Sequence, residues 1–168
     1  MVSSFIIDEP RALAAFKISE LFGRPEIAGE IHRNSFVDGD IPVVSAGRVN
    51  CGISARITGD YKLYEDCLTI DCFGYCAYRE YAFYASRVYV LPRGHYSPEV
   101  AMYIASSITA SLSGRYNFMN RFTLSEYDNA SVYLPVDEAG KIDVPYMTDY
   151  IKRVQLVQRM KMECLGGS

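Results

Sequence analysis

The sequence has 168 residues, of which 49% are hydrophobic and 22% are charged, with a formal net charge of −3 at pH 7. This length suits a single domain whose core needs no metal or disulfide to fold. The hydrophobic content excludes an intrinsically disordered chain, and no apolar run reaches the roughly 18 residues that a membrane span requires. The start, MVSSFIIDEPRA, has an early acidic pair and no basic leader, which is atypical of a signal peptide. We therefore expect a soluble, cytoplasmic, globular domain.

Arginine and tyrosine are unusually frequent. Of the 17 basic residues 12 are Arg, and the chain has 14 Tyr but no Trp. Both side chains are favoured on recognition surfaces, because the guanidinium fork and the amphipathic ring bind at low entropic cost. The acidic balance points away from non-specific binding to nucleic acid, yet residues 79–125 carry a net charge of +3 between acidic ends. A recognition surface and ordinary solvated charge are both compatible with this pattern.

The first half of the chain is predicted to contain short elements separated by long turns. The expected order is a strand at 16–18, a helical turn at 19–22, a long loop at 23–40 and a strand at 41–45. Residues 45–54 (SAGRVNCGIS) are rich in turn formers, and Gly47 and Gly52 permit backbone angles that other residues avoid. Arg48 and Asn50 are therefore predicted to lie on an exposed loop.

The middle of the chain is predicted to form strands at 68–73, 82–84 and 88–91, followed by a turn at 92–94. Tyrosines recur at every third position within it: Tyr75, Tyr78, Tyr81 and Tyr84. This spacing fits neither a helix nor a strand. A bent hairpin with some rings buried and others exposed is the simplest interpretation, and burial of all four rings in the core is the alternative.

A helix is predicted to begin after Ser97, because a capping Ser, a Pro in the first turn and Glu99 favour a helix start. Its core-facing stripe consists of Val100, Ile104, Ile108 and Leu112, and Gly114 ends it. A strand at 131–136 and a turn at 137–141 are expected to follow.

A long helix is predicted at the C-terminal end of the sequence. Asp143 is suited to cap it and Pro145 to its first turn, and it runs to about Glu163. Its apolar seam comprises Met147, Tyr150, Ile151, Val154 and Val157 or Gln158, with Leu156 and Met160 partly off the seam. A seam this wide needs a partner, which is either this domain or another chain.

The sequence contains no recognisable catalytic or metal-binding pattern. The five cysteines, at positions 51, 67, 72, 76 and 164, match no zinc spacing and are expected to be reduced thiols. Neither His32 nor His95 has a nucleophile at a diagnostic spacing, and no Gly-rich phosphate loop is present. The acidic residues Asp137, Glu138 and Asp143 belong to the predicted turn and cap. We therefore expect no metal and no cofactor.

Ordered segments along the chain resemble a known family. They are FKISELF (16–22), GDIPVVSA (39–46), Asn50 and Gly52 of VNCGI, LTIDCFGY (68–75), VYVL (88–91), RYNFMNRFTL (115–124) and VYLPVDEAGKIDVPYMTDYI (132–151). The last segment is the most specific, since its strand, Leu-Pro, acidic Gly turn and Asp-x-x-Tyr-Met-x-x-Tyr-Ile helix start recur together in that family. In this order the segments resemble the target recognition domain of the DNA-specificity (S) subunit of type I restriction–modification systems.

The resemblance implies an α/β (α+β) fold. It would comprise a single target recognition domain with a mixed, twisted β-sheet and packed helices in residues 1–142, and a long C-terminal spacer or dimerisation helix in residues 143–165. In that family, loops of the domain read one half of a split double-stranded DNA site in the major groove. The helix is a spacer and docks methyltransferase (M) subunits. Catalysis belongs to the M and restriction (R) subunits, so the resemblance implies a chain that is not an enzyme.

An S subunit carries two recognition domains and two helices, whereas this sequence has one of each. It resembles half of such a protein, or a half-length subunit that pairs with itself through the final helix to read a two-fold symmetric site. The net charge of −3 implies that the chain alone holds DNA weakly, with partner subunits supplying phosphate contacts.

Arg can donate two hydrogen bonds to guanine and Asn can pair twice with adenine, so both residue types are candidates for reading bases. The candidates are Arg48 and Asn50 on the Gly-flanked turn, Arg115, Asn117, Asn120 and Arg121 after the first long helix, and then Tyr78 and Arg79, with Lys62 more suited to phosphate. For each residue, a solvated or structural role is an equal alternative.

Two other functions remain open. An orphan or phage-borne relative would bind methyltransferase subunits through its helix without reading DNA, which would suit the acidic net charge. A thiol hydrolase would pair Cys51 or Cys72 with His95, although no spacing in the sequence proposes such a pair.

Overall fold

The fold is built from short strands and four α-helices in residues 11–166, the part of the chain that the computed structural model describes, with side chains up to residue 163. The signal-peptide expectation rests mainly on residues 1–10, which lie outside this part. The strands are β1 (Leu13–Lys17), β2 (Glu26–Ile27), β3 (Val37–Val44), β4 (Ile53–Thr58), β5 (Leu63–Tyr64), β6 (Cys67–Ile70), β7 (Cys76–Arg79), β8 (Phe83–Ala85), β9 (Tyr89–Pro92) and β10 (Ser131–Pro135). The helices are α1 (Ile18–Phe22), α2 (Pro98–Leu112), α3 (Leu124–Asn129) and α4 (Val144–Gly166), with 3-10 turns η2 (Arg33–Ser35) and η3 (Val49–Gly52).

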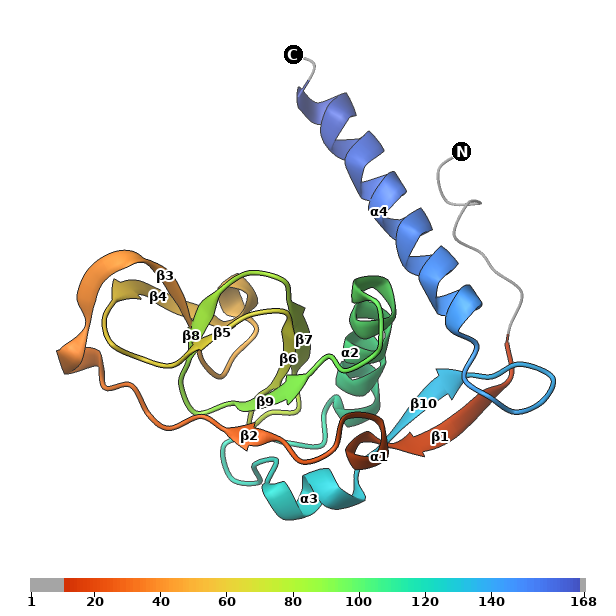
Figure 1. Cartoon of the computed structure of the whole chain (residues 1–168), viewed down its shortest axis with the longest axis horizontal. Helices are drawn as coiled ribbons and strands as arrows, with labels where there is room; N and C mark the ends of the chain where they lie inside the picture. The colour runs from red at the N-terminus through yellow and green to blue at the C-terminus, as the bar shows by residue number, and fades with distance from the viewer. Residues whose placement is uncertain (1–10, 167–168) are drawn as a thin grey trace.

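The strands form three small sheets, which confirms the mixed α/β class but divides the expected single sheet (Figure 1). The sheet of order β4-β3-β8-β5 is mixed, because β3 pairs with β8 in parallel and with β4 antiparallel. The sheet β2-β9-β6-β7 is antiparallel throughout and lies in the middle of the molecule. β1 and β10 form an antiparallel ribbon in which Lys17 lies opposite Ser131.

The central sheet β2-β9-β6-β7 is covered on both faces. Leu68 and Ile70 of β6 belong to the main core cluster with α2, whereas Cys67 packs in a second cluster with Phe83 of the mixed sheet. All four residues of β6 are buried, as expected for a strand with packing on both sides. One end of this sheet, the turn between β6 and β7, therefore lies between helix α2 and the mixed sheet.

Helix α2 confirms the predicted capped helix. The Ser97 hydroxyl accepts a hydrogen bond from the Val100 amide at 3.3 Å, and Pro98 occupies the first turn. The four residues of the predicted stripe are fully buried, namely Val100, Ile104, Ile108 and Leu112. The helix consequently lies between the central sheet and the β1–β10 ribbon (Figure 1).

The first half of α4 docks on its own domain. Asp143 caps the helix as predicted, its Oδ1 accepting a hydrogen bond from the Tyr146 amide at 3.0 Å. Met147 is fully buried, and the ring of Tyr103 on α2 lies 5.4 Å from that of Tyr150. For this half of the seam, the partner is this domain, which was one of the two alternatives.

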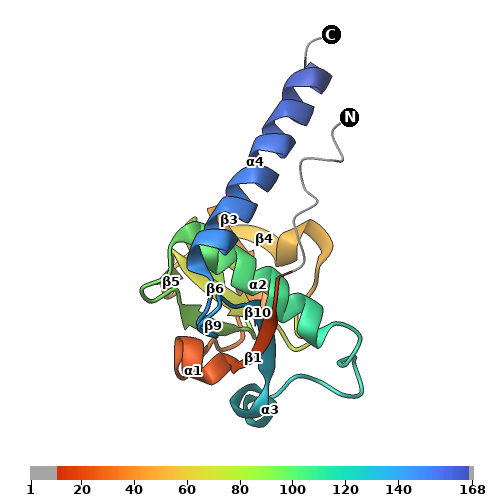
Figure 2. The same cartoon turned by 90° about the vertical axis from the view of Figure 1, so that its right-hand side faces the viewer.

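The second half of α4 extends away from the body of the domain (Figures 1 and 2). Leu156, Met160 and Met162 are exposed on it at 53%, 52% and 73%, although Val157 is buried. A partner for these side chains stays an open prediction. Neither α4 nor another helix in residues 11–166 has the length and hydropathy to cross a bilayer.

The predicted loop at 23–40 and turn at 45–54 were wrong in part. β3 already begins at Val37, and Ile53 begins β4, its antiparallel partner. Gly39, a loop signal in the sequence, lies at an irregularity in this pairing, where a Cβ would approach the Thr58 backbone nitrogen to 2.4 Å. The extended conformation here comes from pairing between distant segments, which local composition does not report.

Helix α3 was not predicted, and the strand expected at 68–73 ends earlier, at Ile70. α3 begins with a capping box. The Thr123 hydroxyl accepts a hydrogen bond from the backbone amide of Glu126, and the Glu126 carboxylate accepts one from the backbone amide of Thr123. The predicted tyrosine-bearing hairpin was wrong, because β7 pairs with β6 in the central sheet whereas β8 pairs with β3 and β5 in the mixed sheet. The predicted mixture of environments is present, since Tyr84 is buried and Tyr81 is 40% exposed, so the four rings do not all lie in the core.

Candidate nucleic-acid interface

The turn between β6 and β7, residues 71–75, organises one end of the molecule. The side chain of Asp71 is 3% exposed. One carboxylate oxygen accepts hydrogen bonds from the amides of Phe73 and Tyr75 at 2.8 and 2.9 Å. The other accepts from the Gly47 amide at 2.8 Å, in a loop 24 positions earlier. A single buried carboxylate therefore joins the 45–52 loop to the turn.

The buried side chain of Arg79 also bonds to the 45–52 loop. This guanidinium is 3% exposed and donates to the Cys51 carbonyl at 2.6 Å, to the Thr69 hydroxyl at 3.2 Å and to the Tyr81 hydroxyl at 3.1 Å. Asn50 and Cys51 have φ of 50° and 54°, in the left-handed region that costs a non-Gly residue roughly 1 kcal/mol or more. The hydrogen bond to the Cys51 carbonyl offsets that cost and fixes the loop.

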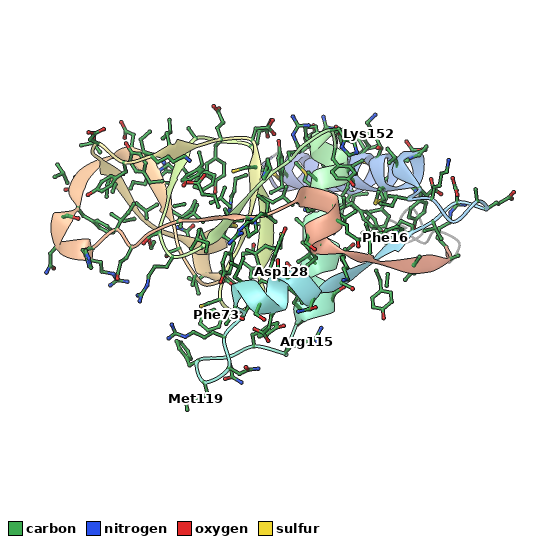
Figure 3. The ribbon with its side chains drawn as sticks, turned by 60° about the horizontal axis from the view of Figure 1, so that its bottom comes forward. Phe16, Phe73, Arg115, Met119, Asp128 and Lys152 are labelled. Atoms are coloured by element: carbon green, nitrogen blue, oxygen red, sulfur yellow. The ribbon has the colours of Figure 1, made fainter. Side chains whose placement is uncertain are left out.

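A second loop, residues 113–122, lies against the other side of the same turn. The Phe122 amide donates to the Cys72 carbonyl at 2.8 Å, and the rings of Phe73 and Phe118 meet edge to face at 5.1 Å. Figure 3 shows Phe73, Arg115 and Met119 on one side of the molecule, with Met119 at the outer end of this loop. We call the surface formed by residues 45–52, 71–75 and 113–122 the loop face.

The loop face brings together the two predicted clusters of Arg and Asn. Arg48 and Asn50 come from its first segment, and Arg115, Asn117, Asn120 and Arg121 from its third; all six are exposed. The guanidinium of Arg48 lies over the Tyr75 ring at 5.7 Å. Within residues 11–166, Arg48, Arg115 and Arg121 form no ion pair with a carboxylate. Their charge is therefore not neutralised by a neighbouring acid.

The three asparagines already make hydrogen bonds within their loops. The Asn50 side chain donates to the Ile53 carbonyl at 3.3 Å. The side-chain oxygen of Asn117 accepts from the amides of Met119 and Asn120, and Asn120 donates to the Arg115 carbonyl at 3.2 Å. These contacts shape the loops and leave each amide group only part of its capacity for an external partner.

Lys62 and Tyr78 lie outside the loop face. The Lys62 ammonium is 2.6 Å from a Glu26 carboxylate oxygen, and the Tyr78 hydroxyl donates to Asp66 at 2.6 Å. Asp66 also forms an ion pair with Arg93 at 2.6 Å, and hydrogen bonds from Arg93 and Tyr78 lower the pKa of Asp66 to about 2. Of the nine predicted residues, six are thus on one surface, Arg79 is buried beneath it, and two are elsewhere.

A cavity of about 410 Å³ adjoins the first segment of the loop face. Its lining includes Ser45, His32, Arg33 and Arg87. The Arg87 guanidinium is 3.3 Å from the carboxylate of Glu30 and so is partly neutralised. Sequence reasoning singled out none of these as binding residues, because they lie in segments with no motif.

Sequence reasoning also missed the residues that assemble the loop face. Asp71 and Phe73 were assigned to a strand, although a Gly at 74 with φ of 78° marks a turn. A Cβ at Gly74 would lie 2.8 Å from that of Leu112 at the end of α2, so the close approach of turn and helix requires Gly. The available signal was the Asp-x-Phe-Gly pattern, in which Asp precedes a Gly by three positions.

The geometry does not favour a thiol nucleophile. The His95 ring packs at a tilt of 36° against the ring of Tyr96 between β9 and α2, and among the described residues it makes no hydrogen bond to Cys51 or Cys72. Burial raises the pKa of the Cys72 thiol, which is opposite to the change that activates a nucleophile. The side chains described up to residue 163 form no group of His, Cys, Asp or Glu that could hold a metal ion, and Cys164 lies outside that range.

Comparison with known proteins gives matches of fold but none of sequence. No protein-family model and no curated protein matches the sequence. The S subunit of a type I restriction–modification system from M. genitalium matches at a TM-score of 0.61 and 12% identity, over 88% of this chain and 39% of that chain. A chain from a structure on complex assembly and conformational transition of the type I R-M system matches at a TM-score of 0.58 and 17% identity, over 94% and 43%. The HsdS subunit from Thermoanaerobacter tengcongensis matches at a TM-score of 0.50 and 18% identity, over 92% and 41%.

Identities this low establish the fold alone. The matches cover about nine-tenths of this chain, and the chain spans about two-fifths of the length of each matched protein. The similarity therefore extends over both the sheets and the helices that support the loop face. The chain therefore has the fold of one half of an S subunit of type I restriction–modification systems, and this half has the size of one target recognition domain.

Proposed function

We propose that the chain is a sequence-specific DNA recognition module of a type I or related restriction–modification system, and that the loop face reads one half of its target site. The observation that carries the proposal is the gathering of Arg48, Arg115 and Arg121 on loops around one buried turn, without acidic partners among the described residues. The S-subunit fold supports it independently.

The three arginines are the better candidates for base contact. An Arg guanidinium can donate two hydrogen bonds to O6 and N7 of guanine in the major groove. The asparagines on the same loops use part of their amide groups to hold the backbone, so they are more suited to single contacts or to shaping the surface. On this proposal Tyr78, Arg79 and Lys62 have structural roles, because their polar atoms already have partners.

The proposal gives catalysis to partner subunits. The chain supplies the DNA-reading surface, and α4 docks methyltransferase subunits and, through them, restriction subunits. Alternatively, two copies pair through the exposed half of α4, which would present two loop faces related by two-fold symmetry. The proposed division is a recognition domain in residues 1–142 and a spacer helix in residues 143–165. The proposed compartment is the cytoplasm, where the cell's DNA lies.

The test is selection of DNA by the chain together with the methyltransferase subunits of the same host. Random duplexes are selected for binding, and affinity for the selected site is then measured by fluorescence anisotropy at several salt concentrations. Arg48→Ala and Arg121→Ala should each weaken binding about 5- to 150-fold, the loss expected for a bidentate base contact. Arg24→Ala, an exposed Arg away from the loop face, is the matched control and should change affinity little.

Equal binding of selected and random DNA would contradict the proposal. The second candidate function, a protein-interaction module, is favoured by the net charge of −3. It predicts that the chain captures methyltransferase subunits while neither the chain nor the complex prefers any DNA sequence. The same selection experiment therefore separates the two functions.

A further inference from the structure

The tip of the 113–122 loop exposes two neighbouring apolar side chains. Phe118 is 77% exposed and Met119 is 96% exposed. In residues 11–163 they are the only consecutive large hydrophobic residues that are both exposed. They contribute little to the core, so folding alone does not account for a Phe and a Met at this position.

The loop presents this tip in a fixed shape. The Asn117 side chain accepts hydrogen bonds from the Met119 and Asn120 amides, and the Asn117 amide donates to the Asn120 carbonyl at 2.8 Å. Phe122 is 2% exposed and anchors the loop in the core. The tip is therefore preorganised. The Phe73 ring also packs edge to face against the Phe118 ring, with the two ring centroids 5.1 Å apart.

The charges beside the tip indicate what it contacts. Arg115 and Arg121 flank it, are exposed and lack carboxylate partners among the described residues. An apolar tip between two free cations is complementary to a surface in which flat apolar groups lie between two rows of anions. The apolar ring faces of an opened base-pair step, which lie between the two phosphate strands of a DNA duplex, have this arrangement.

We propose that Phe118 and Met119 form a wedge that enters between two base pairs of the target and unstacks them. Met119, the outermost side chain, enters the step, and Phe118 on its Phe73 support limits the depth of entry. Arg115 contacts a phosphate on one side of the step, and Arg121 on the other side makes the base contact of the proposed function. Insertion of apolar side chains of this kind kinks the duplex, so the site is recognised in part by how easily one step unstacks. This inference rests on the proposed function.

The experiment uses the full chain with its methyltransferase subunits and duplexes that carry the selected site. 2-Aminopurine is placed at each step in turn, and its fluorescence reports unstacking. The wild-type chain should raise the fluorescence at one step. The Phe118→Ser/Met119→Ser variant should bind the same site without that rise and with an unchanged salt dependence. Val37→Ser, which removes a 61% exposed apolar side chain outside the loop face, is the matched control and should keep the rise.

A duplex with a mismatch at the responsive step supplies a second measurement. Because the mismatch lowers the cost of unstacking, the wild-type chain should bind it about tenfold more tightly than the paired duplex, and the double variant should not distinguish them. Thermal unfolding of the variant should match that of the wild type, since both side chains are exposed.

The outcomes separate the wedge from the function on which it rests. If the wild type shows no sequence-selective binding, the proposed function and the wedge both fail. If it binds selectively but no step becomes fluorescent, or if the double variant gives the same rise, only the wedge is overturned. Loss of methyltransferase capture by the double variant, with unstacking retained, would instead assign the tip to a protein contact and would also overturn the wedge.

Discussion

At the scale of single residues, two buried charged groups hold the loop face together without pairing with each other. Asp71 accepts only backbone amides, and Arg79 donates to a carbonyl and two hydroxyls. Burying such groups is costly unless their hydrogen bonds are complete. Here both side chains reach into the 45–52 loop, so we interpret them as the groups that fix its conformation.

We predict that Arg79→Met loosens the 45–52 loop more than it destabilises the domain. It leaves the Cys51 carbonyl without its donor, which should lower the free energy of unfolding by about 1–3 kcal/mol. Hydrogen exchange at residues 48–52 should become faster, and affinity for the selected DNA should fall. Thr69→Val is the control, because it removes a partner of Arg79 but leaves the bond to Cys51. Unchanged exchange in Arg79→Met would contradict the assigned role.

A second prediction concerns stability at acid pH. The hydrogen bonds from Arg93 and Tyr78 lower the pKa of Asp66 to about 2, against about 3.9 for an unperturbed Asp. A carboxyl group whose pKa is lower in the folded state stabilises that state above its unfolded pKa. This contribution is lost as the pH falls from about 4 to about 2.

Asp66→Asn should therefore lower the free energy of unfolding at pH 5 and make it less dependent on pH between 5 and 2. Denaturant titrations across this range measure the change. Asp60→Asn removes an exposed carboxylate that forms no ion pair within the described residues, and its pH profile should follow the wild type. Parallel profiles for Asp66→Asn and the wild type would refute the prediction.

At the scale of elements, α4 has two halves with different surroundings. Its first half is covered by α2, and its second half extends away from the domain (Figure 2). That second half exposes Leu156 and Met160 to solvent. A helix that leaves the domain with apolar side chains exposed needs a partner to cover them. The geometry is compatible with a methyltransferase subunit or with the same helix of a second copy.

We predict that Leu156→Glu/Met160→Glu abolishes association through α4 without unfolding the domain. The double variant should remain monomeric in sedimentation experiments and should capture methyltransferase subunits at least about tenfold more weakly, because charges replace the apolar contact surface. Gln158→Glu, on the same exposed half, is the control for added charge. An unchanged oligomeric state together with unchanged capture would exclude α4 as the association surface.

Elements with local signals could be predicted from the sequence, and those made by pairing could not. The caps at Ser97 and Asp143 fixed the starts of α2 and α4 because each side chain bonds within its own helix. β4 and the early start of β3 depend on each other across the sheet. Prediction of the site was limited in the same way: residue type identified Arg48 and Arg121, but their common surface depends on contacts made by a turn between them.

At the scale of the whole molecule, the basic residues that are close in the sequence do not lie on one surface of the structure. The net charge of +3 in residues 79–125 is not one basic surface. Arg79 is buried, and Arg87 and Arg93 are ion-paired. Arg115 and Arg121 remain, and the loop face adds Arg48 from outside this segment. Three free cations are few for binding a polyanion, so partner subunits are expected to supply most phosphate contacts.

The β1–β10 ribbon has a consequence for how the chain is made. Residues 13–17 pair with residues 131–135, near the opposite ends of the domain. During synthesis the first strand therefore waits, unpaired, until nearly the whole domain has left the ribosome, and closing so long a loop is slow. Once the ribbon closes, the chain enters and leaves the domain at neighbouring points, with α4 directly beyond β10 (Figure 1). A unit with this layout can be joined to a second copy in one polypeptide without any change to the loops that face away from the junction.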